Sequence, residues 1–152
     1  MKWSSKIAAA ALAAGAVLTL TGASAPLSET ERNRAIVSDF ARLFYGERQV
    51  RQAFERYVVP NYIQHNPNIA DGREAAIVAL EPKFSNPQAR FEVQRIIVDG
   101  AFAVIHLHGR PSPNSRGGAV ADIYRLANGK IVEHWDVLQS VPETAINPHP
   151  MF

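Results

Sequence analysis

The spacing of apolar residues changes near residue 90, and this change most constrains the fold. Before it, apolar side chains recur at intervals of three and four, as on the buried face of an α-helix. From Phe91 onward, β-branched and aromatic residues cluster in short runs separated by turn residues. The order predicts an α+β fold in which N-terminal helices cover one face of a curved antiparallel sheet. A curled sheet closed by helices encloses a pocket, a usual place for a small ligand.

The first predicted helix has a clear beginning and end. Ser28 and Glu31 have the spacing of a capping box, in which each residue satisfies a free backbone N–H at the start of a helix. Apolar residues then recur with helical spacing until Gly46, where the pattern stops. We therefore expect an amphipathic helix between these positions.

Two further helices are predicted before the strands begin. A short one is expected over residues 49–57, and another should begin after residues 71–72 and run toward Pro82. Between them, residues 61–68 are polar and aromatic and fit neither the helical nor the strand period. We interpret this segment as a loop.

Four antiparallel strands are predicted in the second half of the chain. Asp99-Gly100 makes the first turn between them, and residues 111–118 form a longer link rich in Pro, Ser and Gly. The tail over residues 147–150 contains two prolines, so it can be neither a helix nor an inner strand. The expected strands are residues 91–98, 102–108, 119–126 and 131–138.

The first 25 residues have the composition of a secretory signal. Two lysines precede an apolar run over residues 7–20, and small residues follow at Ala23-Ser24-Ala25. The apolar run is shorter than the roughly 20 residues that a membrane-spanning helix needs. We predict a signal peptide over residues 1–25, cleaved after Ala25 or Ala23, and a single domain over residues 26–152. The mature protein is then exported, periplasmic or secreted, and has no membrane partner.

Charge and cysteine content exclude several classes of function. The leader carries two lysines and no acidic residue, so its removal lowers Lys+Arg from 16 to 14, equal to the 14 Asp and Glu. A neutral chain without clustered basic residues is not expected to bind nucleic acid. The chain has no cysteine, which excludes disulfides, thiol catalysis and thiolate metal sites. The fold must therefore be held by packing alone.

Strand alternation groups the residues that can carry chemistry. Successive side chains of a strand point to opposite faces, so His106 and His108 share one face of their strand. On the last strand, His134 and Asp136 share a face by the same rule. The preceding strand contributes Asp122, an aspartate in the middle of an apolar run. Burial of such a carboxylate costs several kcal/mol unless it is paired or neutral.

The turn at residues 127–129 decides which residue lies opposite Asp122. A three-residue loop pairs Asp122 with His134, whereas a two-residue Asn-Gly turn pairs it with Trp135. We favour the first register, because it gathers Asp122, His134 and Asp136 on one surface.

Three interpretations of this cluster remain open at the level of sequence. Asp122 and His134 can form a structural pair, satisfied beneath the helices. They can instead act in catalysis, with a carboxylate base and imidazole groups that donate or orient protons. A zinc or iron site is the third interpretation, although the chain lacks an HExxH motif; its ligands would be His106, His108, His134 and Asp122.

Three segments together resemble a known family. Residues 62–67 (YIQHNP), 122–125 (DIYR) and 129–136 (GKIVEHWD) are similar to the SnoaL-like branch of the nuclear transport factor 2-like superfamily. The resemblance spans nearly all of the mature chain. It implies a cone-shaped α+β barrel, usually dimeric, with a pocket lined by the concave face of the sheet.

The resemblance also implies a type of chemistry. The best-known enzymes of this branch are polyketide cyclases, which close a ring by intramolecular aldol condensation without a cofactor and use an aspartate as acid and base. That aspartate matches Asp122, and an assisting histidine matches His108. Related members catalyse isomerisation, dehydration or epoxide opening with carboxylates at strand positions that resemble Asp136.

The leading hypothesis is a lyase or isomerase without cofactor or metal that acts on a small carbonyl compound. Asp122 would remove a proton next to the carbonyl, and His108 or His134 would polarise the developing enolate. A non-catalytic periplasmic protein that binds a small molecule is the alternative. We further expect a homodimer formed through the apolar back of the sheet. The residues expected to contact the substrate are Tyr62, His65, Asn66, His106 and Asp136.

Overall fold

The computed structural model describes residues 25–152. The predicted signal peptide lies outside the described residues except for Ala25, so export and cleavage stay predictions. Within the described part of the chain, no helix has both the length and the apolarity that crossing a membrane would require.

The helices form where the apolar spacing predicts them. Ser28 caps the first helix: its side chain accepts a hydrogen bond from the Glu31 N–H, and the Glu31 carboxylate accepts one from the Ser28 N–H at 2.7 Å, which confirms the capping box. This helix passes into a π-helical turn, where three successive side chains are buried. The helical elements are α1 (Glu29–Ala41), the π-turn η1 (Arg42–Gly46), α2 (Val50–Tyr57) and α3 (Arg73–Phe84).

A five-stranded mixed sheet forms the second layer. All four predicted strands are present as antiparallel neighbours, and a fifth strand, β1, pairs in parallel with β5. The strand order is β1-β5-β4-β3-β2. The strands are β1 (Val58–Gln64), β2 (Arg90–Asp99), β3 (Phe102–Arg110), β4 (Gly118–Ala127) and β5 (Lys130–Ser140).

Strand β1 corrects part of the interpretation of residues 61–68 as a loop: residues 61–64 belong to the strand, whereas residues 65–68 lie outside any helix or strand. Its register with β5 is irregular between Val58 and Ile63, so the segment lacks the clean alternation that would reveal a strand. It also contains Pro60, which an edge strand tolerates because one side of its backbone needs no partner.

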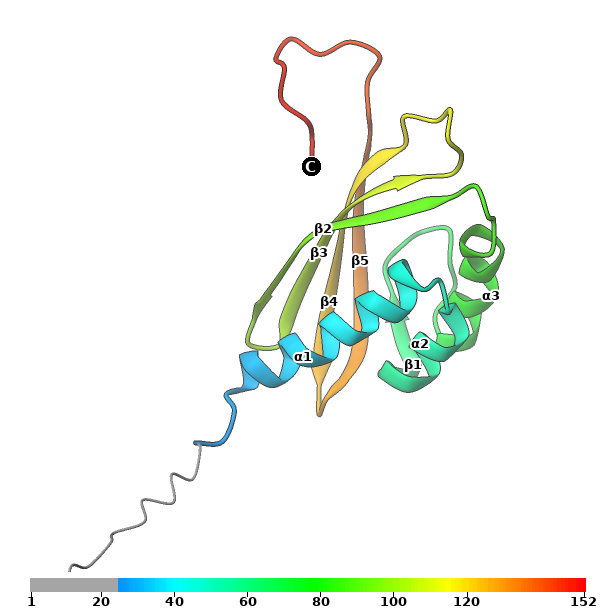
Figure 1. Ribbon diagram of the computed structural model, residues 1–152. Coiled ribbons are helices and arrows are strands. Elements are labelled where there is room, and N and C mark those ends of the chain that lie inside the picture. Colours follow the sequence, from blue (N-terminus) through cyan, green and yellow to red (C-terminus); the bar gives the residue numbers. More distant parts are fainter. Residues whose placement is uncertain (1–24) are drawn as a thin grey trace, which may run out of the picture.

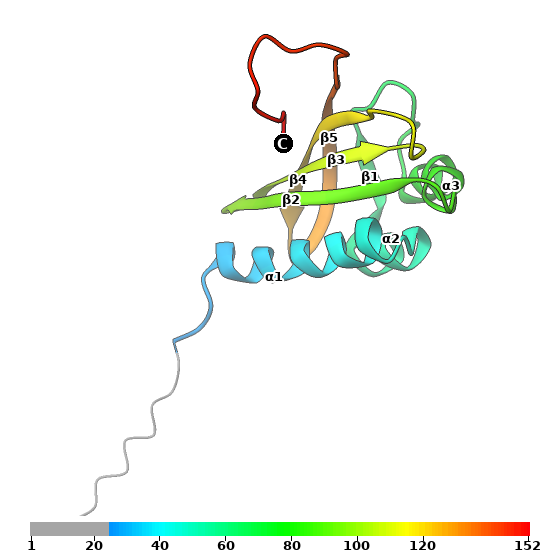
Figure 2. The same ribbon diagram turned by 45° about the horizontal axis from the view of Figure 1, so that its top comes forward.

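The helices cover one face of the sheet, which we call the inner face; the opposite face is the outer face. Figures 1 and 2 show α1, α2 and α3 on the same side of the curved strands. Phe40 of α1 is fully buried and meets Tyr124 of β4 edge to face, with ring centroids 5.4 Å apart. Burial of such aromatic rings supplies much of the apolar stabilisation of a chain without disulfides.

The β4–β5 hairpin differs from both registers considered for it. Ala127 pairs with Lys130 across a two-residue turn whose residues, Asn128 and Gly129, both have positive φ. A bulge next to Arg125 then adds one residue to β5 and shifts the pairing. As a result, Asp122 lies opposite Asp136, and neither His134 nor Trp135 is its partner.

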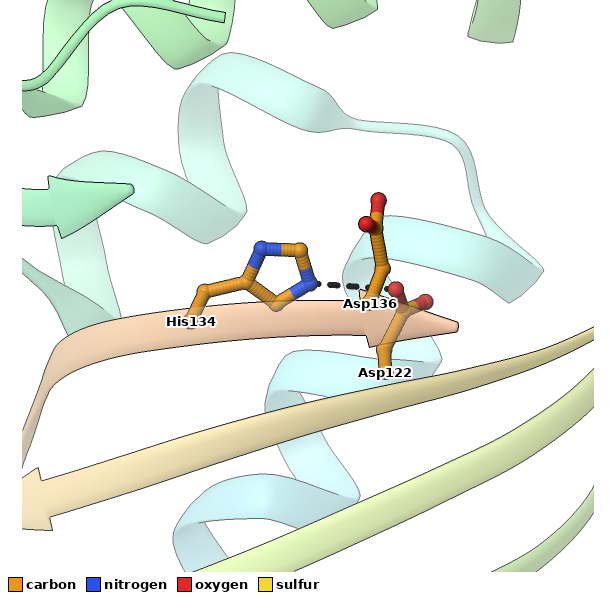
Figure 3. A group of neighbouring side chains, drawn as sticks. All are labelled: Asp122, His134 and Asp136. Atoms are coloured by element: carbon orange, nitrogen blue, oxygen red, sulfur yellow. Dashed lines mark hydrogen bonds and ion pairs between the residues drawn. The ribbon is translucent and has the colours of Figure 1, made fainter. Parts of the chain in front are cut away.

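The bulge nevertheless preserves the expected common face. A two-residue turn alone would place Asp122 opposite Trp135, whose side chain belongs to the outer face. The extra residue in β5 shifts the pairing by one position, so that Asp136 takes the place of Trp135 opposite Asp122. Asp122, His134 and Asp136 therefore all point toward the helices, as Figure 3 shows.

Candidate functional site

A cavity of about 460 Å³ lies between the helices and the inner face of the sheet. This volume falls within the range of small-molecule sites. Most of its wall is aromatic or aliphatic, formed by residues such as Phe44, Phe54, Phe84, Phe91, Leu107 and Val120. Its polar side chains include Gln64, Asn66, Asp122, Tyr124, His134 and Asp136.

Asp122 and His134 form the centre of the polar group. The Nε2 atom of His134 lies 3.0 Å from Oδ1 of Asp122, a hydrogen-bond distance. Figure 3 shows this contact between neighbouring strands β4 and β5. Both residues are buried, with exposed fractions of 8% for Asp122 and 7% for His134. The predicted pairing of an aspartate with a histidine on the face toward the helices is therefore present.

Two buried tyrosines support Asp122. The hydroxyl of Tyr45 donates to Oδ2 of Asp122 at 2.6 Å, and the hydroxyl of Tyr124 lies 2.8 Å from that of Tyr45. Since Tyr45 uses its proton toward the carboxylate, Tyr124 is the donor in the second contact. Burial, together with the nearby charge of Asp122, raises the pKa of Tyr45 and Tyr124 well above the ordinary value. Both phenols therefore act as hydrogen-bond donors.

Gln64 holds the other side of the His134 ring. Its Oε1 atom lies 2.9 Å from Nδ1 of His134 and also accepts a hydrogen bond from the backbone N–H of Asn66 at 2.9 Å. Gln64 was not among the predicted site residues, although its neighbours Tyr62, His65 and Asn66 were; its inward position on β1 was not recognised from the sequence. Tyr62, which was predicted, lines the same cavity, and burial raises the pKa of its hydroxyl.

Asp136 presents a free carboxylate oxygen to the cavity. Asn66, as predicted, lines the cavity, and its side-chain amide donates to Oδ2 of Asp136. Within residues 25–152, no hydrogen bond is formed by Oδ1 of Asp136. By contrast, both oxygens of Asp122 are occupied, one by Tyr45 and one by His134. A carboxylate with an open oxygen is better placed to accept a proton from a bound molecule.

His65 does not contact the cavity. Its ring stacks on Trp135 with centroids 4.6 Å apart, and its Nε2 atom lies 2.8 Å from a Glu133 carboxylate oxygen. These partners belong to the outer face, because β5 alternates and His134 points inward. The expected contact of His65 with a substrate is corrected accordingly.

His106 and His108 also lie on the outer face. Ile105 of the same strand pairs with Asp122 and points inward, so the even-numbered residues of β3 point away from the helices. His108 stacks on the terminal Phe152, with centroids 4.0 Å apart, and its Nε2 atom meets the Arg116 carbonyl oxygen at 2.7 Å. Both histidines therefore lie on the face opposite to that of Asp122. This corrects the predicted assisting role of His108 and the predicted substrate contact of His106.

The four metal ligands considered from the sequence lie on two different faces of the sheet. His106 and His108 are on the outer face and Asp122 and His134 on the inner face, so this set of ligands is wrong. The structure instead brings together Asp122, His134 and Asp136, whose ligand atoms lie within 4.8 Å of one another. These side chains could hold a metal ion with an open coordination position. Hydrogen bonds donated by Tyr45 and Asn66 and accepted by Gln64 account for their arrangement without one.

The chain matches a known protein family. Residues 37–134 match the SnoaL-like domain model. No curated protein sequence matches the chain.

Several solved structures share the fold. An NTF2-like protein of unknown function from Mesorhizobium loti superposes with a TM-score of 0.65 at 18% identity, covering 76% of this chain and 98% of that one. A candidate ketosteroid isomerase from Kribbella flavida gives 0.63 at 15% identity, covering 78% and 86%. A candidate SnoaL-like polyketide cyclase from Jannaschia sp. gives 0.56 at 20% identity, covering 76% and 91%. At these identities the similarity confirms the fold alone.

Proposed function

This chain belongs to the SnoaL-like domain family, and we propose that its cavity is the active site of a cofactor-independent enzyme that moves protons on a small carbonyl compound. The observation that carries the proposal is the Asp122–His134 hydrogen bond with the open oxygen of Asp136 beside it, inside an apolar cavity. Titratable groups gathered in such a cavity are more than a passive apolar site needs.

The geometry divides the roles between the two carboxylates. Asp136 would take the proton from the carbon next to the carbonyl, because its Oδ1 atom is free. The Asp122–His134 pair would give the proton held between Nε2 and Oδ1 to the carbonyl oxygen as the enolate forms. This hydrogen bond would open toward the substrate while those to Gln64 and Tyr45 stay, so that the two transfers balance. This differs from the sequence hypothesis, in which Asp122 removes the proton, because both oxygens of Asp122 are already occupied.

The lining of the cavity supports a proposal for the class of substrate. The aromatic walls favour an apolar, flat body, while the polar side chains favour one carbonyl group. Isomerisation and aldol-type ring closure both begin with removal of a proton next to a carbonyl. We therefore propose a reaction of this type, with enolate formation as its first step.

Asp136→Asn tests the proposed base. The probe is 2-tetralone, a bicyclic ketone, and the measurement is deuterium exchange at its α-carbon in D2O, followed by proton NMR. We expect the variant to exchange at least about 100-fold more slowly than the wild type, the usual contribution of a positioned general base. Asp99→Asn, at the end of β2, is the matched control and should exchange at the wild-type rate. An unchanged rate in Asp136→Asn would remove Asp136 from the mechanism.

We also propose that two copies associate through their outer faces. Three apolar side chains on this face are largely exposed: Ile97 at 56%, Phe102 at 49% and Val137 at 62%. Exposed apolar side chains on one sheet face support an interaction site there, and contact between the same face of two copies suits a two-fold dimer.

The dimer predicts a change in mass for one surface variant. Val137→Glu places a charge on the outer face, within the proposed contact, and should convert a dimer into a monomer in light scattering coupled to size exclusion. Val78→Glu is the control, because Val78 is equally exposed, at 62%, but lies on α3. A monomeric wild-type protein, or a dimeric Val137→Glu variant, would contradict this interface.

A further inference from the structure

We infer that Gln64 is a positioning residue that fixes the tautomer of His134 and thereby obliges the Asp122–His134 pair to hold one proton before any substrate binds. The inference concerns the protonation of the empty site. Only its consequence for turnover rests on the proposed function.

The orientation of the Gln64 amide follows from its two contacts. The Asn66 backbone N–H can only donate, so the Gln64 atom 2.9 Å from it must be the carbonyl oxygen. The same oxygen lies 2.9 Å from Nδ1 of His134. A carbonyl oxygen cannot donate, and therefore Nδ1 of His134 carries a hydrogen. A backbone group thus determines the tautomer through one intermediate side chain.

The second nitrogen of the ring then requires a proton as well. A neutral histidine with its hydrogen on Nδ1 has a lone pair on Nε2. Nε2 lies 3.0 Å from Oδ1 of Asp122, and an ionised carboxylate also offers only lone pairs. Two acceptors at this distance repel each other unless one proton lies between them. The pair is therefore either an imidazolium with a carboxylate or an imidazole with a carboxylic acid.

Neither of the two tyrosine hydroxyls that support Asp122 supplies this proton. Tyr45 directs its hydrogen to Oδ2 of Asp122, on the other side of the carboxyl group from His134. Tyr124 directs its hydrogen to Tyr45. The hydrogen between His134 and Asp122 thus belongs to the pair itself.

The carboxylate opposite Asp122 favours the same state. Asp122 and Asp136 are direct cross-strand partners, and like charges in that position destabilise a sheet. With neutral His134 and both carboxylates ionised, the three side chains would carry a net charge of −2. The proton held by the pair halves the charge of these three side chains; Lys83 and Arg110 also line the cavity.

For the proposed reaction, this means that the site holds the required proton before the substrate binds. The proton needed by the carbonyl oxygen is already held by the pair, while Asp136 is free to accept the proton from carbon. Gln64 touches His134 and not the reacting atoms, so its role is to hold the ring in the form that makes this division possible.

The test uses the whole protein labelled with ¹⁵N-histidine, and it measures the protonation of each ring nitrogen of His134 by long-range ¹H–¹⁵N correlation. The His134 signals are assigned by their loss in His134→Asn. We expect a protonated Nδ1 in the wild type. Gln64→Leu removes the acceptor and should release the Nδ1 hydrogen to solvent, leaving Nδ1 bare and the proton of the pair on Nε2. Gln64→Glu keeps an acceptor oxygen and should retain the wild-type form. The His65 and His108 signals, on the outer face, serve as internal controls.

Several outcomes would overturn the inference. A bare Nδ1 in the wild type would do so without any variant, so the test holds even if Gln64→Leu fails to fold. An unchanged His134 tautomer in a folded Gln64→Leu protein would also contradict it.

A second readout connects the tautomer with turnover. In the 2-tetralone assay, Gln64→Leu is expected to exchange about 10- to 100-fold more slowly, the range found for outer-shell partners of metal-bound histidines, with Gln64→Glu restoring the rate. If no version of the protein exchanges the ketone, the proposed function fails while the NMR result still decides the tautomer. If Gln64→Leu shows the changed tautomer and an unchanged rate, the link between the two is wrong.

Discussion

Replacement of Asp122 by asparagine is expected to slow deuterium exchange of 2-tetralone about 100- to 10,000-fold while leaving the fold intact. Asparagine has nearly the same shape as aspartate, so its oxygen can accept the Tyr45 hydroxyl and its amide nitrogen can donate to Nε2 of His134. The hydrogen bonds persist, but the acid proton shared with His134 is lost. The measurement is the NMR exchange rate, with circular dichroism and thermal unfolding to show that the variant is folded.

Asp122→Leu separates structure from chemistry at the same position. Leucine removes the acceptor of the buried Tyr45 hydrogen and the partner of Nε2 of His134, which costs about 1–3 kcal/mol of stability for each group left unsatisfied. Asp122→Asn should therefore lose activity and keep stability, whereas Asp122→Leu should lose both. If Asp122→Asn exchanges the ketone at the wild-type rate, the Asp122–His134 pair is a structural pair and not a proton donor.

Replacement of Phe40 by alanine should lower the free energy of unfolding by about 3–5 kcal/mol. Phe40 is 0% exposed and its ring lies 5.4 Å from those of Phe44 and Tyr124 and 5.7 Å from that of Phe54, measured between centroids. Alanine would leave a cavity between α1 and the sheet that these rings cannot fill. A chain without disulfides has no covalent link to offset the loss.

Urea unfolding of the Phe40→Ala protein measures this loss directly. The control is Val78→Ala, because Val78 is 62% exposed and its truncation should change stability by less than about 0.5 kcal/mol. A loss below about 1 kcal/mol for Phe40→Ala would mean that the aromatic cluster does not hold α1 to the sheet.

Local sequence patterns were sufficient to predict most elements. The capping residues of α1 and the four antiparallel strands follow from periodicities of a few residues. These signals are local, because a helix turn or a strand repeat is completed within the segment that carries it. The SnoaL-like resemblance, which the domain match confirms, rests on three such segments. The common face of Asp122 and His134 was expected from a register that the structure does not have, and the bulge next to Arg125 restores it.

Features that depend on distant partners could not be predicted in this way. Strand β1 is stabilised by parallel pairing with β5, about 70 residues later, and no pattern within residues 58–64 indicates it. Alternation showed that His106 and His108 share a face but not which face meets the helices. That choice depends on pairing of Ile105 with Asp122 across two strands.

The hydrogen bond from Tyr45 to Asp122 was not predicted, because the helix type changes in η1, which contains Tyr45. An α-helix does not bury three consecutive side chains against one surface, but the π-turn η1 buries Leu43, Phe44 and Tyr45 together. The turn places the Tyr45 hydroxyl on Asp122. Tyr124 could have been found, because it lies two residues beyond Asp122 on the same face of β4.

The most direct test of the proposed chemistry compares the wild type with the double variant Asp122→Asn/Asp136→Asn. The measurement is the rate of α-deuterium incorporation into 2-tetralone at equal occupancy of the cavity, with ketone binding determined separately by calorimetry. We predict that the wild type exchanges the ketone well above the rate in buffer and that the double variant binds it but exchanges it at the buffer rate. A wild-type protein that binds the ketone and exchanges it no faster than the double variant would contradict the account and identify the cavity as a binding site only.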